Sequence, residues 1–314
     1  MATQKKERSE DKPQFHPKNP FNKRYDFSKL TESFPDLSPF VKKNPFGDLS
    51  IDFFDPKAVL ALNQALLKYY YKINRYTLPV NYLAAPIPGR ADYLHYLNDL
   101  LATDKNTNSH PIRCLDIGVG ANCIYPIIGT RTFGWNFVGT DIDGSSIKNA
   151  QKLVKDNDGL FSKIEIRFQK NKREILNHVI KKGEKYDLSI CNPPFHSSSE
   201  QAKQSGTQKY QNLKRSRKVK PVSNFGGQAN ELWTQGGEER FIAQMVSESK
   251  AYKNQVRWFT CLLSKSKHIK RAVKAIEEQG VVEHRLIEMN QGNKSSRFLA
   301  WTYLTPEERA SWKS

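Results

Sequence analysis

The sequence predicts an α/β protein with a Rossmann-like, doubly wound sheet of seven strands, parallel except for an antiparallel hairpin at one edge. From residue 111 onward, short apolar segments that are typical of strands alternate with helix-sized segments. This alternation favours parallel strands joined by crossover connections. The last two apolar segments are separated only by a short polar turn, which indicates an antiparallel pair. With 314 residues and 38% apolar side chains, the chain can form one large core.

The expected strands follow from short apolar or alternating runs that end at acids, glycines or prolines. In chain order they are residues 112–118, 135–143, 163–169, 186–192, 256–264, 281–289 and 297–304. Residues 144–157 and 268–280 have helical spacing, and Gly280 supplies a stop signal for the second helix. The order of these segments predicts a sheet whose first four connections cross over.

The chain divides by composition into four regions. Residues 1–25 are polar and charged and are expected to form a disordered basic arm. Residues 26–110 form an extension with two helical patterns, one beginning at Asp55 and one after the Pro-Gly pair at position 88. The extension is a candidate RNA-binding region, residues 111–304 form the predicted α/β domain, and 305–314 form a tail. Residues 196–236 have almost no apolar periodicity, so they are predicted to be a basic, glycine-rich substrate loop.

The balance of charge favours a polyanionic partner. Fifty Lys and Arg face 32 Asp and Glu, which gives a formal charge of +18; such an excess favours nucleic acid over acidic peptides. The four cysteines are scattered and form no metal-binding or disulfide pattern, so no metal is expected. The N-terminus has no apolar signal segment and no run is long enough to span a membrane. We therefore expect a cytoplasmic protein, a monomer, with no membrane partner.

A glycine loop and an acid indicate a site for a nucleoside cofactor. Gly118 and Gly120 follow the first strand of the predicted sheet, and Asp141 closes the second. Glycines there let the backbone approach a ligand, and an acid at the end of the next strand commonly binds ribose hydroxyls. The order alone leaves a dinucleotide and S-adenosylmethionine open. Cys123 in place of a third glycine, and Asp116 before the loop, favour the methyl donor. Asp116 would hold the donor's ammonium or orient the loop. Asn122 is a weaker candidate by position.

The tetrad Asn192-Pro193-Pro194-Phe195 stands at the end of the fourth strand of the predicted sheet, at the edge where such sheets bind ligands. The side-chain oxygen of Asn192 and the carbonyl of Pro193 are two acceptors, which suits the two N–H groups of a planar exocyclic amine. Phe195 could stack on the ring. The tetrad therefore predicts a clamp for an amine such as adenine N6.

These motifs resemble a known family. The tetrad downstream of the glycine loop is similar to the signature of class I S-adenosylmethionine-dependent amino-methyltransferases. Together with "PIPGRADYLHYLNDLL", "NFGGQANELWTQGGEERFI" and "NKSSRFLAWTYL", it resembles the ribosomal large subunit adenine-N6-methyltransferase F family over residues 16–304. The resemblance implies methylation of one adenine in bacterial 23S rRNA, on free RNA or on an assembly intermediate. It also implies a cofactor contact for Arg90, which could pair with the donor's carboxylate.

The basic run that follows the tetrad suggests how RNA reaches it. Residues 201–220 hold seven Lys or Arg and no acid, and cations beside the clamp could neutralise flanking phosphates. The predicted RNA-binding residues are Lys209, Lys214, Arg215, Arg217, Lys218 and Lys220. Two alternatives remain. A protein glutamine-N5 methyltransferase could use the same clamp, although it usually has Tyr in place of Phe195; the other is a non-catalytic RNA-binding module.

Overall fold

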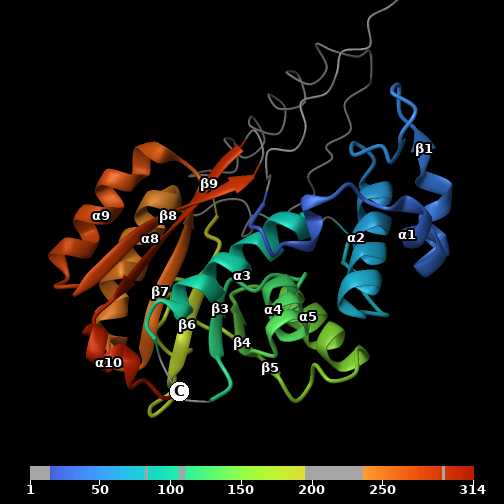
Figure 1. The fold of residues 1–314 in the computed structure, drawn as a ribbon. Helices are drawn as coiled ribbons and strands as arrows, with labels where there is room; N and C mark the ends of the chain where they lie inside the picture. The colour runs from blue at the N-terminus through green and yellow to red at the C-terminus, as the bar shows by residue number, and fades with distance from the viewer. Residues whose placement is uncertain (1–14, 81, 83, 106–109, 195–235, 292–293) are drawn as a thin grey trace, which may run out of the picture.

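The computed structural model describes residues 15–80, 82, 84–105, 110–194, 236–291 and 294–314, and its centre is a seven-stranded sheet (Figure 1). The strand order is β5-β4-β3-β6-β7-β9-β8. The strands are β3 (Arg113–Ile117), β4 (Asn136–Asp141), β5 (Ile164–Phe168), β6 (Tyr186–Cys191), β7 (Val256–Leu263), β8 (Glu283–Gln291) and β9 (Lys294–Thr302). All seven were predicted from the sequence, and the fold class is confirmed.

Parallel pairing covers most of the sheet. β3 pairs in parallel with β4 and β6, β4 with β5, and β6 with β7. The hairpin β8–β9 is antiparallel, and β9 lies between β7 and β8. The antiparallel strand is therefore second from the edge, while β8 on the edge runs parallel to β7. The carboxyl ends of β3, β4, β6 and β7 consequently lie along one edge.

Helices cover both faces of the sheet, as the alternation of strands and helices predicts (Figure 1). One apolar cluster joins one face to α3 (Ile87–Ala102), α4 (Ile124–Phe133) and α5 (Gly144–Asp156). A second cluster joins the other face to α8 (Gly237–Ser249) and α9 (Ile269–Glu278). Residues alternate between the faces, since Cys114 belongs to the first cluster and Leu115 to the second. The same alternation predicts on which face of the sheet the first side chains after a strand lie.

The N-terminal extension shares the first of these clusters. It contains α1 (Phe27–Ser33), β1 (Lys42–Lys43), β2 (Leu49–Ser50) and α2 (Pro56–Tyr71). Asp55 caps α2 by accepting a hydrogen bond from the Lys57 N–H at 2.9 Å, as its position before proline predicts. Buried residues of α1 and α2 belong to the same cluster as α3 and α4. The extension therefore packs as one body with the sheet domain.

Residues 15–25, which the sequence placed in the disordered arm, lie against α3. The His16 N–H donates to Asp92 Oδ1 at 2.6 Å, and the His16 ring is 2.8 Å from Asp99 Oδ2. Asn19 donates to the carbonyl of Pro88 at 3.1 Å. The local charge and proline content did not predict this packing, because the residues that His16 and Asn19 contact are about 70 or more positions away in the sequence. Residues 1–14 of the expected arm lie outside the described residues.

Two local expectations differ from the structure. α3 begins at Ile87, ahead of the Pro-Gly pair. A proline is tolerated in the first turn because the backbone N–H that it lacks would have no partner inside the helix. The connection between β5 and β6, residues 169–185, is helix-sized but consists of turns. Glu248 of α8 accepts the backbone N–H groups of Ile175 and Leu176 at 2.9 and 2.7 Å and so fixes these turns. No helix in the described part of the chain is long and apolar enough to cross a membrane.

Candidate active site

The glycine loop lies between the carboxyl ends of β3 and β4. The N–H groups of Gly118 and Val119 both donate to the carbonyl of Thr140, at 2.9 and 2.8 Å. Gly118 and Gly120 have φ of 74° and 63°, a conformation that L side chains rarely adopt. Apart from its chain neighbours, no heavy atom of the described residues lies within 4 Å of the position that a Cβ at Gly118 would occupy. The loop therefore presents bare backbone to an open space, as the sequence predicts for a cofactor loop.

Asp116 is buried on the α3 side of β3, directly before this loop. Its side chain is 1% exposed, and neither carboxylate oxygen has a hydrogen-bond partner among the described residues. Burial raises the pKa of Asp116 to about 8, the nearby Asp141 adds to the rise, and the charge of Arg90 opposes it. A buried carboxylate without partners is costly unless a cation or a donor pairs with it. This position therefore fits the ammonium of a bound ligand.

Asp141 ends β4 and holds the glycine loop. Its Oδ2 accepts from the Gly120 N–H and its Oδ1 from the Asp143 N–H, both at 2.9 Å. Burial raises the pKa of Asp141, and these backbone hydrogen bonds oppose the rise. Each oxygen keeps a second lone pair that can accept a hydrogen bond from a hydroxyl group. The geometry suits the expected contact with a ribose.

Asn122 faces the N-terminal extension. Its amide oxygen accepts from the hydroxyl of Tyr76 at 2.6 Å and from the Ala85 N–H at 3.4 Å, and the residue is buried. These contacts tie the glycine loop to the segment that leads into α3. A contact with cofactor stays a prediction for this residue.

The clamp begins where β6 ends. Ile190 belongs to the cluster under α3 and Cys191 to the opposite one, so the alternation places Asn192 on the side of α3. Asn192 and Pro194 are half-buried and Pro193 is buried. Phe195 lies outside the described residues. The structure thus brings Asn192 to the edge of the sheet that also carries Asp116 and the glycine loop.

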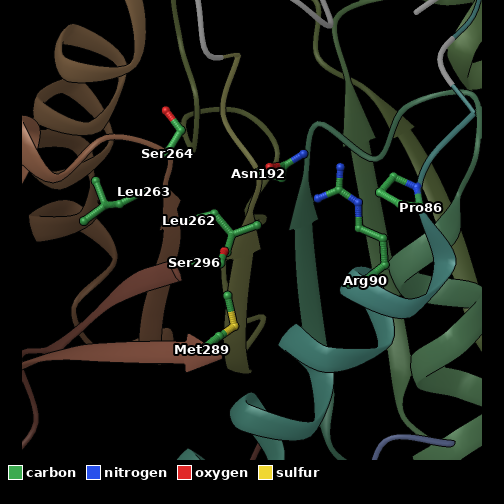
Figure 2. Close-up of a pocket in the computed structure, with 9 residues that line it drawn as sticks. Pro86, Arg90, Asn192, Leu262, Leu263, Ser264, Met289 and Ser296 are labelled. Carbon is green, nitrogen blue, oxygen red and sulfur yellow. The ribbon is translucent and has the colours of Figure 1, made fainter. Parts of the chain in front are cut away.

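Arg90, on the first turns of α3, reaches across to the clamp (Figure 2). In the amide orientation that satisfies both groups, the Asn192 oxygen accepts from Arg90 Nη1 and Nη2 at 3.1 and 3.0 Å. Nη1 also donates to the hydroxyl of Tyr125 at 2.7 Å, and the guanidinium lies 5.4 Å from that ring's centroid. The family resemblance implied a cofactor contact for Arg90, whereas sequence analysis did not predict its contacts with Asn192 and Tyr125. Two segments about 100 residues apart make this contact, and no local pattern signals it.

A cavity of about 200 Å³ opens beside Asn192 and Arg90 (Figure 2). Its walls come from α3, β7, β8 and β9, and are lined by Pro86, Gly89, Leu262, Leu263, Ser264, Met289 and Ser296. Sequence reasoning missed all seven as site residues. The only signal was the position of Ser264 directly after a predicted strand.

Glu238 supports one wall of this cavity. It lies in the first turn of α8, is 1% exposed, and accepts from the Ser264 N–H at 2.6 Å. Its other oxygen is 2.6 Å from His268 Nδ1. The carboxylate therefore joins the start of α8, which follows the predicted substrate loop, to the end of β7.

Comparison with known proteins identifies the family of this chain. A family model described as RNA methyltransferase matches residues 9–305. The chain belongs to this family. "Ribosomal RNA large subunit methyltransferase F" of Bacteroides fragilis is 49% identical over 92% of this chain and 98% of its own length. The protein of that name from Cytophaga hutchinsonii is 46% identical over 99% and 97%.

Solved structures agree with the family. The catalytic domain of human METTL16 in complex with the MAT2A 3′UTR hairpin 1 is 30% identical, with a TM-score of 0.78 over 93% of this chain and 96% of that one. The N-terminal domain of human METTL16 in complex with SAH is 27% identical and has a TM-score of 0.74. The match covers 93% of this chain and 99% of that one. The resemblance seen in the motifs is confirmed, and the protein is an RNA methyltransferase.

The predicted RNA-binding residues lie outside the described residues. They are Lys209, Lys214, Arg215, Arg217, Lys218 and Lys220, all within 195–235. Their role in RNA binding stays a prediction that rests on their charge and on their position after the clamp.

Proposed function

We propose that this protein transfers a methyl group from S-adenosylmethionine to the N6 amine of one adenine in 23S ribosomal RNA. The family supports RNA as the substrate class, and the names of the bacterial relatives support large-subunit rRNA. One observation carries the assignment to an amine. Asn192 and Pro193 directly follow β6, at the same edge of the sheet as the glycine loop and as Asp116, whose carboxylate oxygens have no partner among the described residues.

The residues at this edge fit the parts of the donor. Asp116 would pair with the ammonium, because its buried oxygens have no partner among the described residues. Arg90 would bind the carboxylate, which its guanidinium matches in shape and charge. Asp141 would accept from the ribose hydroxyls, and Gly118 and Gly120 keep the loop free of side chains. When bound, the donor supplies an electrophilic methyl group at the clamp.

The clamp then acts on the target amine. Adenine N6 is a poor nucleophile because its lone pair is delocalised into the ring. Asn192 Oδ1 and the Pro193 carbonyl would each accept one N6–H, favour a more tetrahedral nitrogen and stabilise its developing positive charge. Phe195 would stack on the base, and the cavity beside Asn192 offers room for a flipped-out nucleotide. The proton leaves to water, so a strong base is not required.

RNA would be held by charge around this edge. The six basic residues predicted in the loop would neutralise phosphates on either side of the target. The N-terminal extension, packed against α3 and α4, is a second candidate surface. Together they would present one nucleotide to the clamp.

The test is transfer of radiolabelled methyl groups from S-adenosylmethionine to total RNA from cells that lack this protein, followed by nucleoside analysis. We expect label in N6-methyladenosine of 23S rRNA, at one position. Repeating the reaction on free rRNA and on isolated assembly particles identifies the preferred form of the substrate.

Two results would overturn the proposal. Label in protein glutamine would indicate the alternative methyltransferase, and absence of transfer to every substrate would indicate an RNA-binding module. A modified nucleoside other than N6-methyladenosine would refute the adenine-amine assignment alone.

A further inference from the structure

Arg90 is placed to serve two partners in turn. Both of its terminal nitrogens point at the amide oxygen of Asn192, at 3.1 and 3.0 Å. The hydroxyl of Tyr125 holds Nη1 at 2.7 Å, while Nε is buried with no hydrogen-bond partner in the described part of the chain. Figure 2 shows the guanidinium and the amide next to one another at the wall of the cavity.

This contact competes with the clamp. An amide oxygen has two lone pairs, and two donors from one guanidinium use both. In the proposed reaction the same oxygen of Asn192 accepts a hydrogen from adenine N6. A guanidinium beside that nitrogen also opposes the positive charge that develops there in the transition state. Arg90 must therefore leave Asn192 before the amine can react.

A carboxylate is a better partner for Arg90 than the amide. A guanidinium–carboxylate pair joins two opposite charges through parallel hydrogen bonds, whereas the amide oxygen of Asn192 is neutral. Asp116 lies close enough for the charge of Arg90 to lower its pKa, and both of its oxygens are unpartnered among the described residues. Arg90 and Asp116 are thus a cation and an acid that match the carboxylate and ammonium of an α-amino acid group.

We propose that Arg90 makes the clamp dependent on the methyl donor. Without donor, the Arg90 guanidinium donates hydrogen bonds to the side-chain oxygen of Asn192. These bonds break when the guanidinium pairs with the donor's carboxylate, so the donor binds before Asn192 can accept a hydrogen bond from the target amine. The proposal rests on the proposed function. It adds an order of binding and a second role for Arg90, as the residue that positions Asn192.

The experiment follows entry of the base and does not depend on catalysis. The RNA segment that the wild-type protein methylates carries 2-aminopurine next to the target adenine, and its fluorescence rises when the target leaves the stack. Two saturating ligands are compared: S-adenosylhomocysteine, which has the amino acid group, and 5′-methylthioadenosine, which lacks it. We expect the fluorescence to rise severalfold with the first ligand and to stay at the ligand-free value with the second.

Variants separate this role from simple cofactor binding. Arg90→Ala should raise the fluorescence without any ligand, because Asn192 is then free. Asp141→Ala is the matched control: it should weaken the binding of S-adenosylhomocysteine but leave the ligand-free fluorescence at the wild-type value. Circular dichroism checks that both variants are folded.

Equal effects of the two ligands on the wild-type protein would overturn the proposal, even if a variant failed to fold. A ligand-free signal for Arg90→Ala equal to that of the wild type would overturn it as well. Failure of the proposed function is a separate result, because it would appear earlier, as the absence of a methylated adenine from which to design the segment.

Discussion

Among single residues, Asp116 combines complete burial with two carboxylate oxygens that have no hydrogen-bond partner among the described residues. Sequence analysis placed it before the glycine loop as a partner for an ammonium group. Its environment adds a measurable property, a raised pKa, because a buried carboxyl group stays protonated at pH values far above its ordinary pKa.

Replacing Asp116 with Asn should change how stability depends on pH. The pKa of Asp116 is about 8 in the folded protein against an ordinary value of 3.8. Between these values the folded state binds more protons, so its free energy of unfolding should fall as pH rises, by at most about 1.4 kcal/mol per pH unit. Asp116→Asn should remove this component and make the protein more stable than the wild type at pH 8 to 9.

Urea unfolding from pH 4 to 9 measures this difference. The exposed Asp158, changed to Asn, is the control and should leave the pH profile of the wild type unaltered. A difference between Asp116→Asn and the wild type that does not grow from pH 4 to 8 would contradict the prediction.

Asn192→Ala tests the clamp. Loss of one of the two acceptors should lower kcat for methyl transfer to RNA by about 100-fold or more, the usual effect of removing a group that stabilises developing charge. Donor affinity should not fall, because the change releases Arg90. Calorimetry measures that affinity and single-turnover transfer measures the rate.

Asp141→Ala should show the opposite pattern to Asn192→Ala. Donor affinity should drop, because the ribose loses its partner and Gly120 loses the acceptor of its N–H at 2.9 Å. Full activity of Asn192→Ala, or unchanged donor affinity of Asp141→Ala, would remove the respective residue from the proposed site.

At the scale of elements, the start of α8 is fixed to the end of β7 by one carboxylate. Glu238 accepts from the Ser264 N–H and contacts His268, both at 2.6 Å. We expect Glu238→Ala to lower the free energy of unfolding by about 1–3 kcal/mol, the cost of leaving buried polar groups unsatisfied. Because Ser264 lines the cavity, the variant should also raise KM for RNA.

The neighbouring Glu239 supplies a matched control. Its partner Arg271 is 72% exposed, and exposed ion pairs contribute about 0–1 kcal/mol. Glu239→Ala should therefore have a small effect in the same urea titration. Equal losses for the two variants would contradict the role given to Glu238.

The predicted substrate loop can be tested through salt. Changing Lys214, Arg215 and Arg217 to Ala should weaken RNA binding, because fewer phosphates are then neutralised. The slope of log K against log salt should become shallower by about 0.7 for each phosphate of single-stranded RNA that no longer has a basic partner. Filter binding between low and high salt measures the slope. An unchanged slope would show that these side chains do not bind phosphates.

Over the whole molecule, the amino edge of the sheet is closed by a buried charge cluster. Asp104 follows α3 and accepts from Arg257 of β7 and from Arg309 of α10 (Pro306–Ala310), each at 2.8 Å. Arg257 and Arg309 are 1% and 3% exposed. This cluster links three parts of the chain that are distant in sequence and lies at the edge opposite the site.

Asp104→Ala should be the most destabilising of the single changes considered. Removing one partner from a buried ion pair costs about 3–5 kcal/mol, because the remaining charges stay desolvated. Thermal unfolding measures the loss. Glu278→Ala, at the exposed Lys274–Glu278 pair, should leave the midpoint nearly unchanged, and a similar shift for both variants would count against a structural role for the cluster.

The sequence by itself determined the order and type of the main elements, because alternation of apolar residues is a local property of the chain. It also placed Asp116, Gly118, Asp141 and Asn192 at the ends of their strands. Parallel strands bring such ends to one edge, so their proximity followed from the fold class. The turns of residues 169–185 were not predictable in this way, because Glu248 of a later helix fixes them.

Only the tertiary structure decided what these side chains contact. The pairing of Arg90 with Asn192, the pocket wall held by Glu238 and the packing of His16 on α3 join segments between 26 and 102 positions apart. Such contacts depend on how helices cross the sheet, and no spacing within one segment encodes that. The local pattern therefore determined which residues reach the active edge, whereas packing decided which of them restrain one another.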